Sequence, residues 1–289
     1  MITNKHGLPD PIVRAVQGFE DEYQKGHREF SDISVTSLIS PPQLESLKGQ
    51  HNGHLVEDAS DRIWALMGSA VHRVLEHSAE EGAVIEARLF TEVCDWTLSG
   101  QLDYYKDGML NDYKFASVWE SIYGLKPERA AQLNVLAYLC QVNKMPVERI
   151  QIVAIHRDWS QSKAKFEANY PPQVKGIDVD LWSESEQLMY IAERIALHKL
   201  AREGGQVPCT PEDRWHQPDT WAVTKKGRKR ALRVLESEEE AREWAIAGNH
   251  ALDLIEFRPG EDRRCSDYCP VSSVCPQWGQ IQAAYESEG

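Results

Sequence analysis

The stretch "GQLDYYKDGMLNDYK", residues 100–114, predicts a β-hairpin. Its central Asp-Gly pair predicts a tight turn, because glycine accepts the positive φ that such turns need. Side chains alternate along a strand, so Asp112 and Lys114 are expected to point to the same side. Asp103 lies on the first arm. One side of a largely apolar hairpin is therefore expected to carry two carboxylates and a lysine.

This combination of charges suggests a cation site. Two aspartates on adjacent strands repel each other unless positive charge lies between them, and a divalent cation supplies more of it than a lysine does. Mg²⁺ usually takes one or two carboxylates together with water and substrate phosphate. We therefore expect Asp103 and Asp112 to bind Mg²⁺ or Mn²⁺, and Lys114 to hold the attacking water or stabilise developing charge. On spacing alone, an exposed hairpin whose charges face water is an equal alternative.

The segment before the hairpin, residues 61–82, predicts a helix that ends at Gly82. Its apolar positions recur at helical spacing: Ile63, Leu66, Met67, Val71, Val74 and Leu75. Gly68, His72 and Glu76 are four residues apart and share one face, where Gly68 would let another backbone approach closely. His72 is a candidate metal ligand because it precedes the acidic hairpin. A lone helical histidine is more often a core or surface residue.

The region that follows alternates between helix and strand patterns. Residues 126–144 predict a helix with one apolar face, residues 149–158 a short buried strand, and residues 179–203 a long helix. This order predicts an α/β fold with a mixed central β-sheet flanked by helices, over residues 61–205.

Two further regions flank this core. Residues 1–60 are rich in loops with some helix signals, including a Ser- or Thr-capped start and a Pro-Pro break. Residues 206–289 predict a small cysteine-rich module, into which a basic β-hairpin and a helix are inserted at about 219–247.

Four segments together carry a family resemblance. "GSAVHRVLE", "GQLD", "DYK" and "QLNVLAYL", in this order and spacing, resemble the PD-(D/E)xK nuclease superfamily. The most similar branch is that of the RecB-like exonucleases, which includes CRISPR-associated and phage-encoded members. The resemblance covers roughly residues 61–160, and it implies a restriction-endonuclease-like core.

The resemblance also implies roles for individual residues. Metal ligands are matched by His72, Asp103, Asp112 and the backbone carbonyl of Tyr113. Lys114 matches the catalytic lysine, and Gln132 matches a glutamine on the following helix that helps to orient the site. The family often has a tyrosine four residues after that glutamine, where this chain has Leu136.

The C-terminal region contains a candidate metal site made of cysteines. Cys265, Cys269 and Cys275 lie in one proline-containing loop, and Cys209, which opens the same module, is the best candidate for a fourth ligand. Structural zinc sites often use paired C-x₂₋₄-C knuckles, so one distant cysteine with a tail of three fits a 4Fe–4S cluster better. The tail resembles that of the iron–sulfur RecB-like nucleases, although in CRISPR-associated members the lone cysteine precedes the nuclease motifs. Structural Zn²⁺ is the alternative.

The charge composition limits the ways in which the chain can bind DNA. The 289-residue chain has a net charge of −13, which argues against broad non-specific nucleic-acid binding but leaves room for a local basic groove. The basic cluster consists of Lys225, Lys226, Arg228, Lys229 and Arg230, with a solvated turn as the alternative. Trp119 and Trp221 are candidates for stacking on single strands, although packing is the more common role of tryptophan.

Localisation follows from what the chain lacks. No apolar run approaches the ~20 residues that span a bilayer, and the N-terminus lacks the pattern of a signal peptide. We therefore expect a protein of the cytoplasm of a bacterial host cell, without a membrane partner.

The expected function is a metal-dependent DNA exonuclease that hydrolyses phosphodiester bonds at DNA ends, in phage or bacterial recombination, repair or replication. A recombination or replication protein is a candidate partner. The alternatives are a catalytically silent DNA-binding scaffold of the same fold, a zinc-stapled adaptor and an iron–sulfur redox protein.

Overall fold

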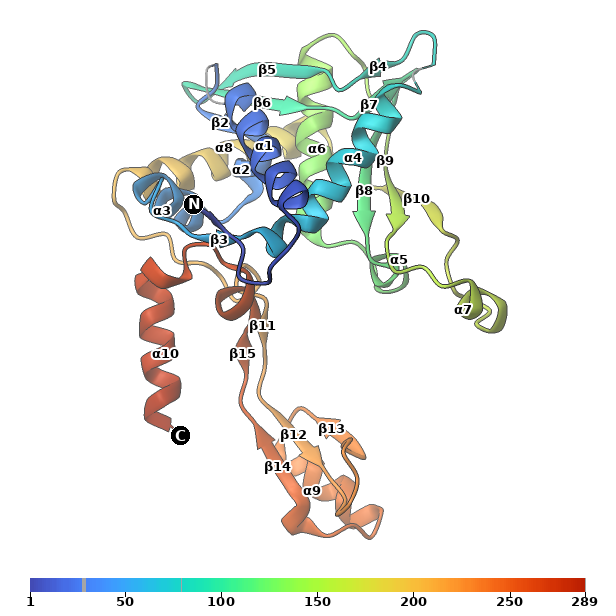
Figure 1. The fold of residues 1–289 in the computed structure, drawn as a ribbon, viewed down its shortest axis with the longest axis vertical. Coiled ribbons are helices and arrows are strands. Elements are labelled where there is room, and N and C mark those ends of the chain that lie inside the picture. Colours follow the sequence, from blue (N-terminus) through green and yellow to red (C-terminus); the bar gives the residue numbers. More distant parts are fainter. Residues whose placement is uncertain (28–29, 79, 289) are drawn as a thin grey trace. The chain divides into compact units, whose positions relative to one another are not determined.

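The computed structural model describes residues 1–27, 30–78 and 80–288 (Figure 1). The chain divides into two compact units, Met1–Val207 and Pro208–Gly289.

The first unit is built on two mixed sheets. The larger has the strand order β10-β9-β8-β7-β4 and the smaller has the order β2-β6-β5. The larger sheet consists of β4 (Val84–Ile85), β7 (Tyr104–Lys106), β8 (Met109–Ala116), β9 (Arg149–His156) and β10 (Val174–Val179). The smaller consists of β2 (Ile33–Ser34), β5 (Arg88–Val93) and β6 (Trp96–Gln101). Strands β8 and β9 are parallel, as are β2 and β6, and the other neighbours are antiparallel.

The predicted hairpin is formed by β7 and β8, which pair with Lys106 opposite Met109. Both turn residues have positive φ, 47° at Asp107 and 80° at Gly108, as a type I′ hairpin turn requires. The first arm is shorter than the sequence suggested. Its first two residues, Gly100 and Gln101, belong to β6, which pairs with β5 in the smaller sheet instead of with β8.

Eight helices of the described residues complete the first unit: α1 (Asp10–His27), α2 (Val35–Ile39), α3 (Pro42–Gln50), α4 (Ile63–Glu76), α5 (Val118–Tyr123), α6 (Pro127–Val142), α7 (Gln161–Phe166) and α8 (Glu184–Arg202). The predicted helices in the region of α6 and α8 are thus confirmed. Helix α6 begins with proline at its first position, where the missing N–H costs nothing, and a Ser183–Glu186 capping box starts α8.

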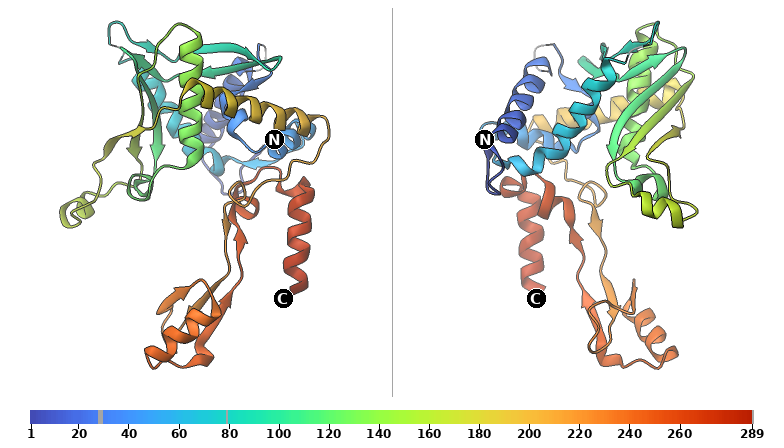
Figure 2. Two further views of the ribbon diagram at one scale, coloured as in Figure 1. Left: turned by 180° about the vertical axis from the view of Figure 1, so that it is seen from behind. Right: turned by 45° about the vertical axis from the view of Figure 1, so that its right-hand side comes forward.

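Helix α6 lies at the centre of the hydrophobic core. It packs against α8, and the two cross in the left view of Figure 2. Gly100 of β6 allows α6 to pack closely, because a Cβ at that position would lie 2.7 Å from the side chains of Leu136 and Leu139. Residues 1–60 also contribute to this core through Ile33 and Leu38. The N-terminal segment therefore shares one core with the sheets.

Helix α4 differs from the expectation in two ways. It ends at Glu76 and not near Gly82, and none of its side chains is fully buried. Met67 and Val74, part of its apolar stripe, are exposed. The expectation of a close backbone approach at Gly68 is also wrong, since no described atom lies within 4 Å of the Cβ position there.

The two glycines predict opposite effects of alanine. Gly68→Ala should stabilise the protein by about 0.5–1 kcal/mol, because alanine loses less entropy in a helix and meets no neighbour here. Gly100→Ala should destabilise it by about 1–3 kcal/mol through overpacking against α6. Urea unfolding of both variants measures the difference, and equal effects would contradict this account of the packing.

The second unit contains a small three-stranded sheet of order β13-β12-β14, with β12 (Thr220–Val223), β13 (Arg233–Leu235) and β14 (Ile255–Arg258). Helix α9 (Glu238–Ala247), capped by Ser237, packs against it around Val223 and Ala241. The predicted strand–turn–strand and short helix are therefore confirmed. The unit also contains β11 (His216–Gln217), β15 (Glu261–Asp262) and α10 (Pro276–Glu288). Within the described ranges, no helix combines the length and the apolar character needed to cross a membrane.

Candidate metal centre

Two carboxylates meet where a two-stranded ribbon passes from one sheet to the other. The ribbon is β4–β7 in the larger sheet and β5–β6 in the smaller one, and Glu86 and Asp103 lie at the crossing. The backbone N–H of Glu86 donates to the carbonyl of Asp103 (3.1 Å), and the backbone N–H of Leu102 donates to the carbonyl of Ala87 (3.0 Å). The two strands of the ribbon therefore stay hydrogen-bonded through the crossing. Glu86 has φ 49°, which is uncommon for a residue other than glycine. The turn of the ribbon thus brings the two acidic side chains together.

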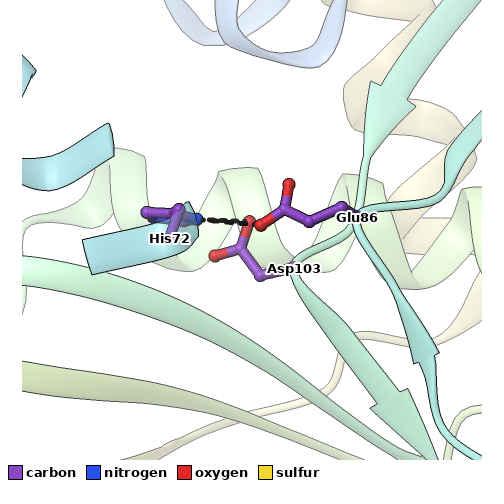
Figure 3. Close-up of side chains that lie close together, drawn as sticks. All are labelled: His72, Glu86 and Asp103. Carbon is purple, nitrogen blue, oxygen red and sulfur yellow. Dashed lines mark hydrogen bonds and ion pairs between the residues drawn. The ribbon is translucent and has the colours of Figure 1, made fainter. Parts of the chain in front are cut away.

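Helix α4 adds a histidine to this pair (Figure 3). His72 Nδ1 lies 3.1 Å from Glu86 Oε1 and 3.6 Å from Asp103 Oδ1. One ligand atom from each of the three side chains lies within 4.8 Å of the other two, and no other such group of His, Cys, Asp or Glu occurs in the described part of the chain. The group has the nitrogen and oxygen donors that a divalent cation needs. The sequence had singled out His72 and Asp103 but not Glu86.

Glu86 is held in place by a chain of hydrogen bonds. Gln101 Nε2 donates to Glu86 Oε2 (2.5 Å), and Arg88 Nη2 donates to Gln101 Oε1 (2.9 Å). Supporting contacts of this kind orient metal ligands. A signal for Glu86 does exist in the sequence, since it interrupts the apolar run Val84-Ile85-Glu86-Ala87, but the run is too short to indicate a strand by itself.

The strand next to this group carries an ion pair. Lys114 Nζ lies 2.9 Å and 2.7 Å from the two carboxylate oxygens of Asp112, and the Asp112 side chain is buried. The backbone N–H of Tyr113, between them, donates to Asp103 Oδ2 (2.7 Å). In a strand the N–H and C=O of one residue face the same neighbour, so the Tyr113 carbonyl is also directed toward this side.

Negative charge is in excess at the centre, and the pKa of Asp103 reflects this. Burial and the neighbouring Asp112 raise that pKa to about 7, although Lys114 and His72 oppose the change. The pKa of His72 is raised as well, chiefly by its hydrogen bond to Glu86. The pKa of Glu86 is lowered, because its hydrogen bonds to His72 and Gln101 outweigh burial. A bound cation would relieve the repulsion between the two aspartates, so the donor set suits a divalent metal ion.

Gln132 is not part of this hydrogen-bond network within the described residues. It is half-buried on α6, and no hydrogen bond joins it to the residues of the metal centre in the described part of the chain. Of the six positions that the resemblance implied, His72 and Asp103 belong to the group with Glu86, and Asp112, Tyr113 and Lys114 lie on the adjacent strand.

Cys209 and the three cysteines of the tail all belong to the second unit. The backbone N–H of Cys209 donates to Gln277 Oε1 (2.8 Å), and Gln277 Nε2 donates to the Cys209 carbonyl (2.9 Å), which ties Cys209 to the start of α10 just after Cys275. Burial first, then Asp213 and the three other thiols, raise the pKa of Cys209 to about 12.

These thiols do not form a preformed site for one ion. No three of them have sulfur atoms within 4.8 Å of one another in the described residues. Four thiolates around one tetrahedral Zn²⁺ would be separated by about 3.8 Å, since Zn–S bonds are about 2.3 Å long.

The basic cluster of residues 225–230 lies in the loop between β12 and β13 and is exposed. It belongs to the second unit, whereas the metal centre belongs to the first. Trp221 of β12 contacts Phe257, with 5.1 Å between ring centroids, and borders the small core beside α9. Packing therefore accounts for Trp221.

Comparisons with known proteins indicate the fold and no more. No protein-family model matches the chain, and no curated protein matches it. The crystal structure of SSO0001 is 13% identical and aligns over 92% of this chain and 97% of its own, with a TM-score of 0.51. The crystal structure of a "Putative exonuclease" from Eubacterium rectale is also 13% identical, over 69% of this chain and 70% of its own, with a TM-score of 0.34. The first likeness indicates a shared mixed α/β fold, and the second is too low to carry an argument.

Proposed function

We propose that the protein is a divalent-metal-dependent deoxyribonuclease of the RecB-like PD-(D/E)xK type, acting at DNA ends in phage or bacterial recombination, repair or replication. One observation carries the proposal: the grouping of His72, Glu86 and Asp103 beside the buried ion pair of Asp112 and Lys114. Motifs far apart in the sequence thus supply one compact set of chemical groups.

The donor set suits Mn²⁺ and Mg²⁺. Carboxylate oxygens are the preferred protein ligands of both, and the imidazole of His72 favours Mn²⁺ more than Mg²⁺. His72, Glu86 and Asp103 would hold the ion, with Asp112 and the Tyr113 carbonyl as further ligands. When bound, such an ion supplies Lewis-acid polarisation of a phosphoryl oxygen and lowers the pKa of a bound water.

The lysine performs the remaining chemistry. Both oxygens of Asp112 hold the Lys114 ammonium in a fixed position, and its side chain is mostly shielded from solvent. An ammonium has three donors, so Lys114 can donate to Asp112 and also to a water or phosphate oxygen. Its positive charge stabilises the extra negative charge that develops on the phosphate.

The direct test uses the full chain with end-labelled linear DNA, single-stranded and double-stranded, in Mg²⁺, in Mn²⁺ or in EDTA. We expect nucleotides to be released from linear DNA with either metal and none in EDTA. A covalently closed circle of the same sequence should survive, since it has no end. Cleavage of the circle would contradict the exonuclease part of the proposal, and intact linear DNA with both metals would contradict all of it.

His72→Ala should weaken the use of metal more than it weakens DNA binding. The variant loses the nitrogen ligand but keeps both carboxylates, so excess Mn²⁺ should restore part of the lost cleavage. A titration of rate against Mn²⁺ concentration measures this, with DNA affinity in EDTA as the control. A metal dependence equal to that of wild type would assign His72 a structural role.

For the second unit we propose a 4Fe–4S cluster held by Cys209, Cys265, Cys269 and Cys275, with Zn²⁺ as the alternative. The support is the sequence pattern of one distant cysteine with a tail of three, together with the hydrogen bonds that tie Cys209 to Gln277, just after Cys275. We also propose that the basic cluster of residues 225–230 contacts DNA phosphates, since all five of its cations are exposed.

Substitution of any of the four cysteines by serine should remove the brown colour and lower the soluble yield. Metal binding contributes to the folding free energy of a small unit with little core, and a cluster with three thiolates is held less firmly. Cys94→Ser, at an exposed position of the first unit, is the matched control and should keep colour and yield. The wild type isolated without oxygen should release about four irons per chain. One zinc and no iron would refute the cluster.

A further inference from the structure

An exposed aromatic stack lies on α5. The rings of Trp119 and Tyr123, one helical turn apart, are nearly parallel at 9°, with 5.6 Å between centroids. Trp119 is 48% exposed and Tyr123 is 82% exposed. No other ring contacts Tyr123 in the described residues, so its outer face is open to solvent. Packing of the core does not account for this pair.

Positive charge surrounds the stack. Lys163 of α7 lies over the Trp119 ring, with its Nζ 5.5 Å from the ring centroid. Residues 157–175 contain four cations and two carboxylates, in a chain whose net charge is −13. One of the carboxylates, Asp158, is occupied by Ser117 Oγ (2.6 Å) and the backbone N–H of Val118 (2.7 Å). The surface around the stack therefore carries local positive charge.

A third exposed ring lies on α4. Trp64 of α4 is 54% exposed, lies 5.0 Å from the Arg157 guanidinium and contacts Phe115, with 6.1 Å between ring centroids. Phe115 directly follows Lys114 on β8. Arg157 and Lys163 belong to the same β9–α7 segment, so cations border both aromatic sites.

The position of the stack follows from β8. This strand carries Asp112 and Lys114, ends at Ala116 and leads into α5, as Figure 1 shows. The three residues from Lys114 to Ser117 span about 10 Å of extended chain. The stack therefore directly follows, along the chain, the strand that carries Asp112 and Lys114.

We infer that Trp64, Trp119, Tyr123, Arg157 and Lys163 form a stacking platform for unpaired bases of single-stranded DNA. Unpaired bases have a free π-face that can stack on Tyr123, whereas the bases of a duplex already stack on each other. The cations bind the phosphates of the strand. This deepens the proposed function and rests on it for the identity of the strand as the substrate.

Binding can be tested apart from cleavage. The full chain with Asp112→Asn, in EDTA, is titrated against fluorescent oligothymidine, and anisotropy gives the Kd. Tyr123→Ala and Trp119→Ala in this background should each raise the Kd about 5- to 100-fold, the loss of one stacked base. Tyr123→Phe should restore binding because it keeps the ring. The matched control is Phe90→Ala, which removes a partly exposed ring from the smaller sheet and should leave the Kd unchanged.

Salt and substrate distinguish stacking from general charge attraction. Lys163→Ala should reduce the slope of log Kd against log salt concentration by about 0.7, the value for one phosphate contact on a single strand. Tyr123→Ala should keep the slope and weaken single-stranded binding more than binding of a blunt duplex. Unchanged single-strand affinity in both Tyr123→Ala and Trp119→Ala, or an equal loss on duplex, would overturn the platform and leave the nuclease proposal standing. Weakened single-strand binding in these variants, together with a wild-type protein that cuts no DNA, would support the platform and refute the nuclease proposal.

Discussion

Asp112→Asn and Lys114→Ala are each expected to reduce DNA cleavage by about a hundredfold or more, the usual cost of removing a group that stabilises charge in a transition state. Asp112→Asn removes a charged candidate ligand and half of an ion pair with contacts of 2.7 Å and 2.9 Å. Lys114→Ala removes the positive charge nearest to the aspartates. Rates measured on end-labelled DNA with saturating Mn²⁺ test both variants.

Folding must be checked separately, because Lys114→Ala leaves Asp112 buried without its partner, which costs about 3–5 kcal/mol in comparable sites. Asp112→Asn keeps the shape of the side chain and avoids this problem. Lys106→Ala, on the same hairpin, is the matched control, since it breaks only an exposed, solvent-screened ion pair with Glu80. Cleavage within a few-fold of wild type in a folded Asp112→Asn protein would remove Asp112 from the mechanism.

Asp103→Asn is expected to destroy cleavage and yet to stabilise the metal-free protein at pH 8. Burial and Asp112 raise the pKa of Asp103 to about 7 in the folded state, from the ordinary value of 3.8 that applies in the unfolded chain. The folded protein therefore holds a proton that the unfolded chain has released, and stability is lost as the pH rises from about 4 to about 7. The difference corresponds to at most about 4 kcal/mol. Asparagine is neutral and does not pay this cost.

Urea unfolding in EDTA at pH 5 and at pH 8 measures the effect. Wild type should be less stable at pH 8 than at pH 5, and Asp103→Asn should show a smaller difference between the two. Saturating Mn²⁺ at pH 8 should restore wild-type stability, because an ion that binds only the folded state stabilises it, but should do little for the variant. A variant less stable than wild type at pH 8 without metal would contradict the account of charge excess.

Local rules account for what the sequence predicted of the fold. The Asp-Gly turn fixes the hairpin because both turn residues need positive φ, and both have it. The alternation of a strand then places Asp112 and Lys114 on one side, where they form an ion pair. Helices α6 and α8 lie within the predicted ranges 126–144 and 179–203, and α8 begins five residues later than predicted, after its Ser183 cap.

Long-range packing decided the features that the sequence did not predict. The apolar stripe of α4 suggested burial, but periodicity indicates only which side of a helix is apolar. It does not indicate how deeply that side is buried, and α4 keeps exposed apolar side chains. Residues 1–60 share the core of the sheets, because β2 pairs with β6 from more than sixty residues away. Such contacts depend on which segments meet in space, and no local pattern encodes them.

The sequence by itself determined the hairpin, the shared side of Asp112 and Lys114, and the main helices, since each follows from interactions among residues close in the chain. Only the tertiary structure decided that Glu86 joins His72 and Asp103, because this depends on where the ribbon β4–β7 and β5–β6 passes between two sheets. A carboxylate becomes part of a charged centre through its neighbours in space, and those neighbours lie 14 and 17 positions away along the chain.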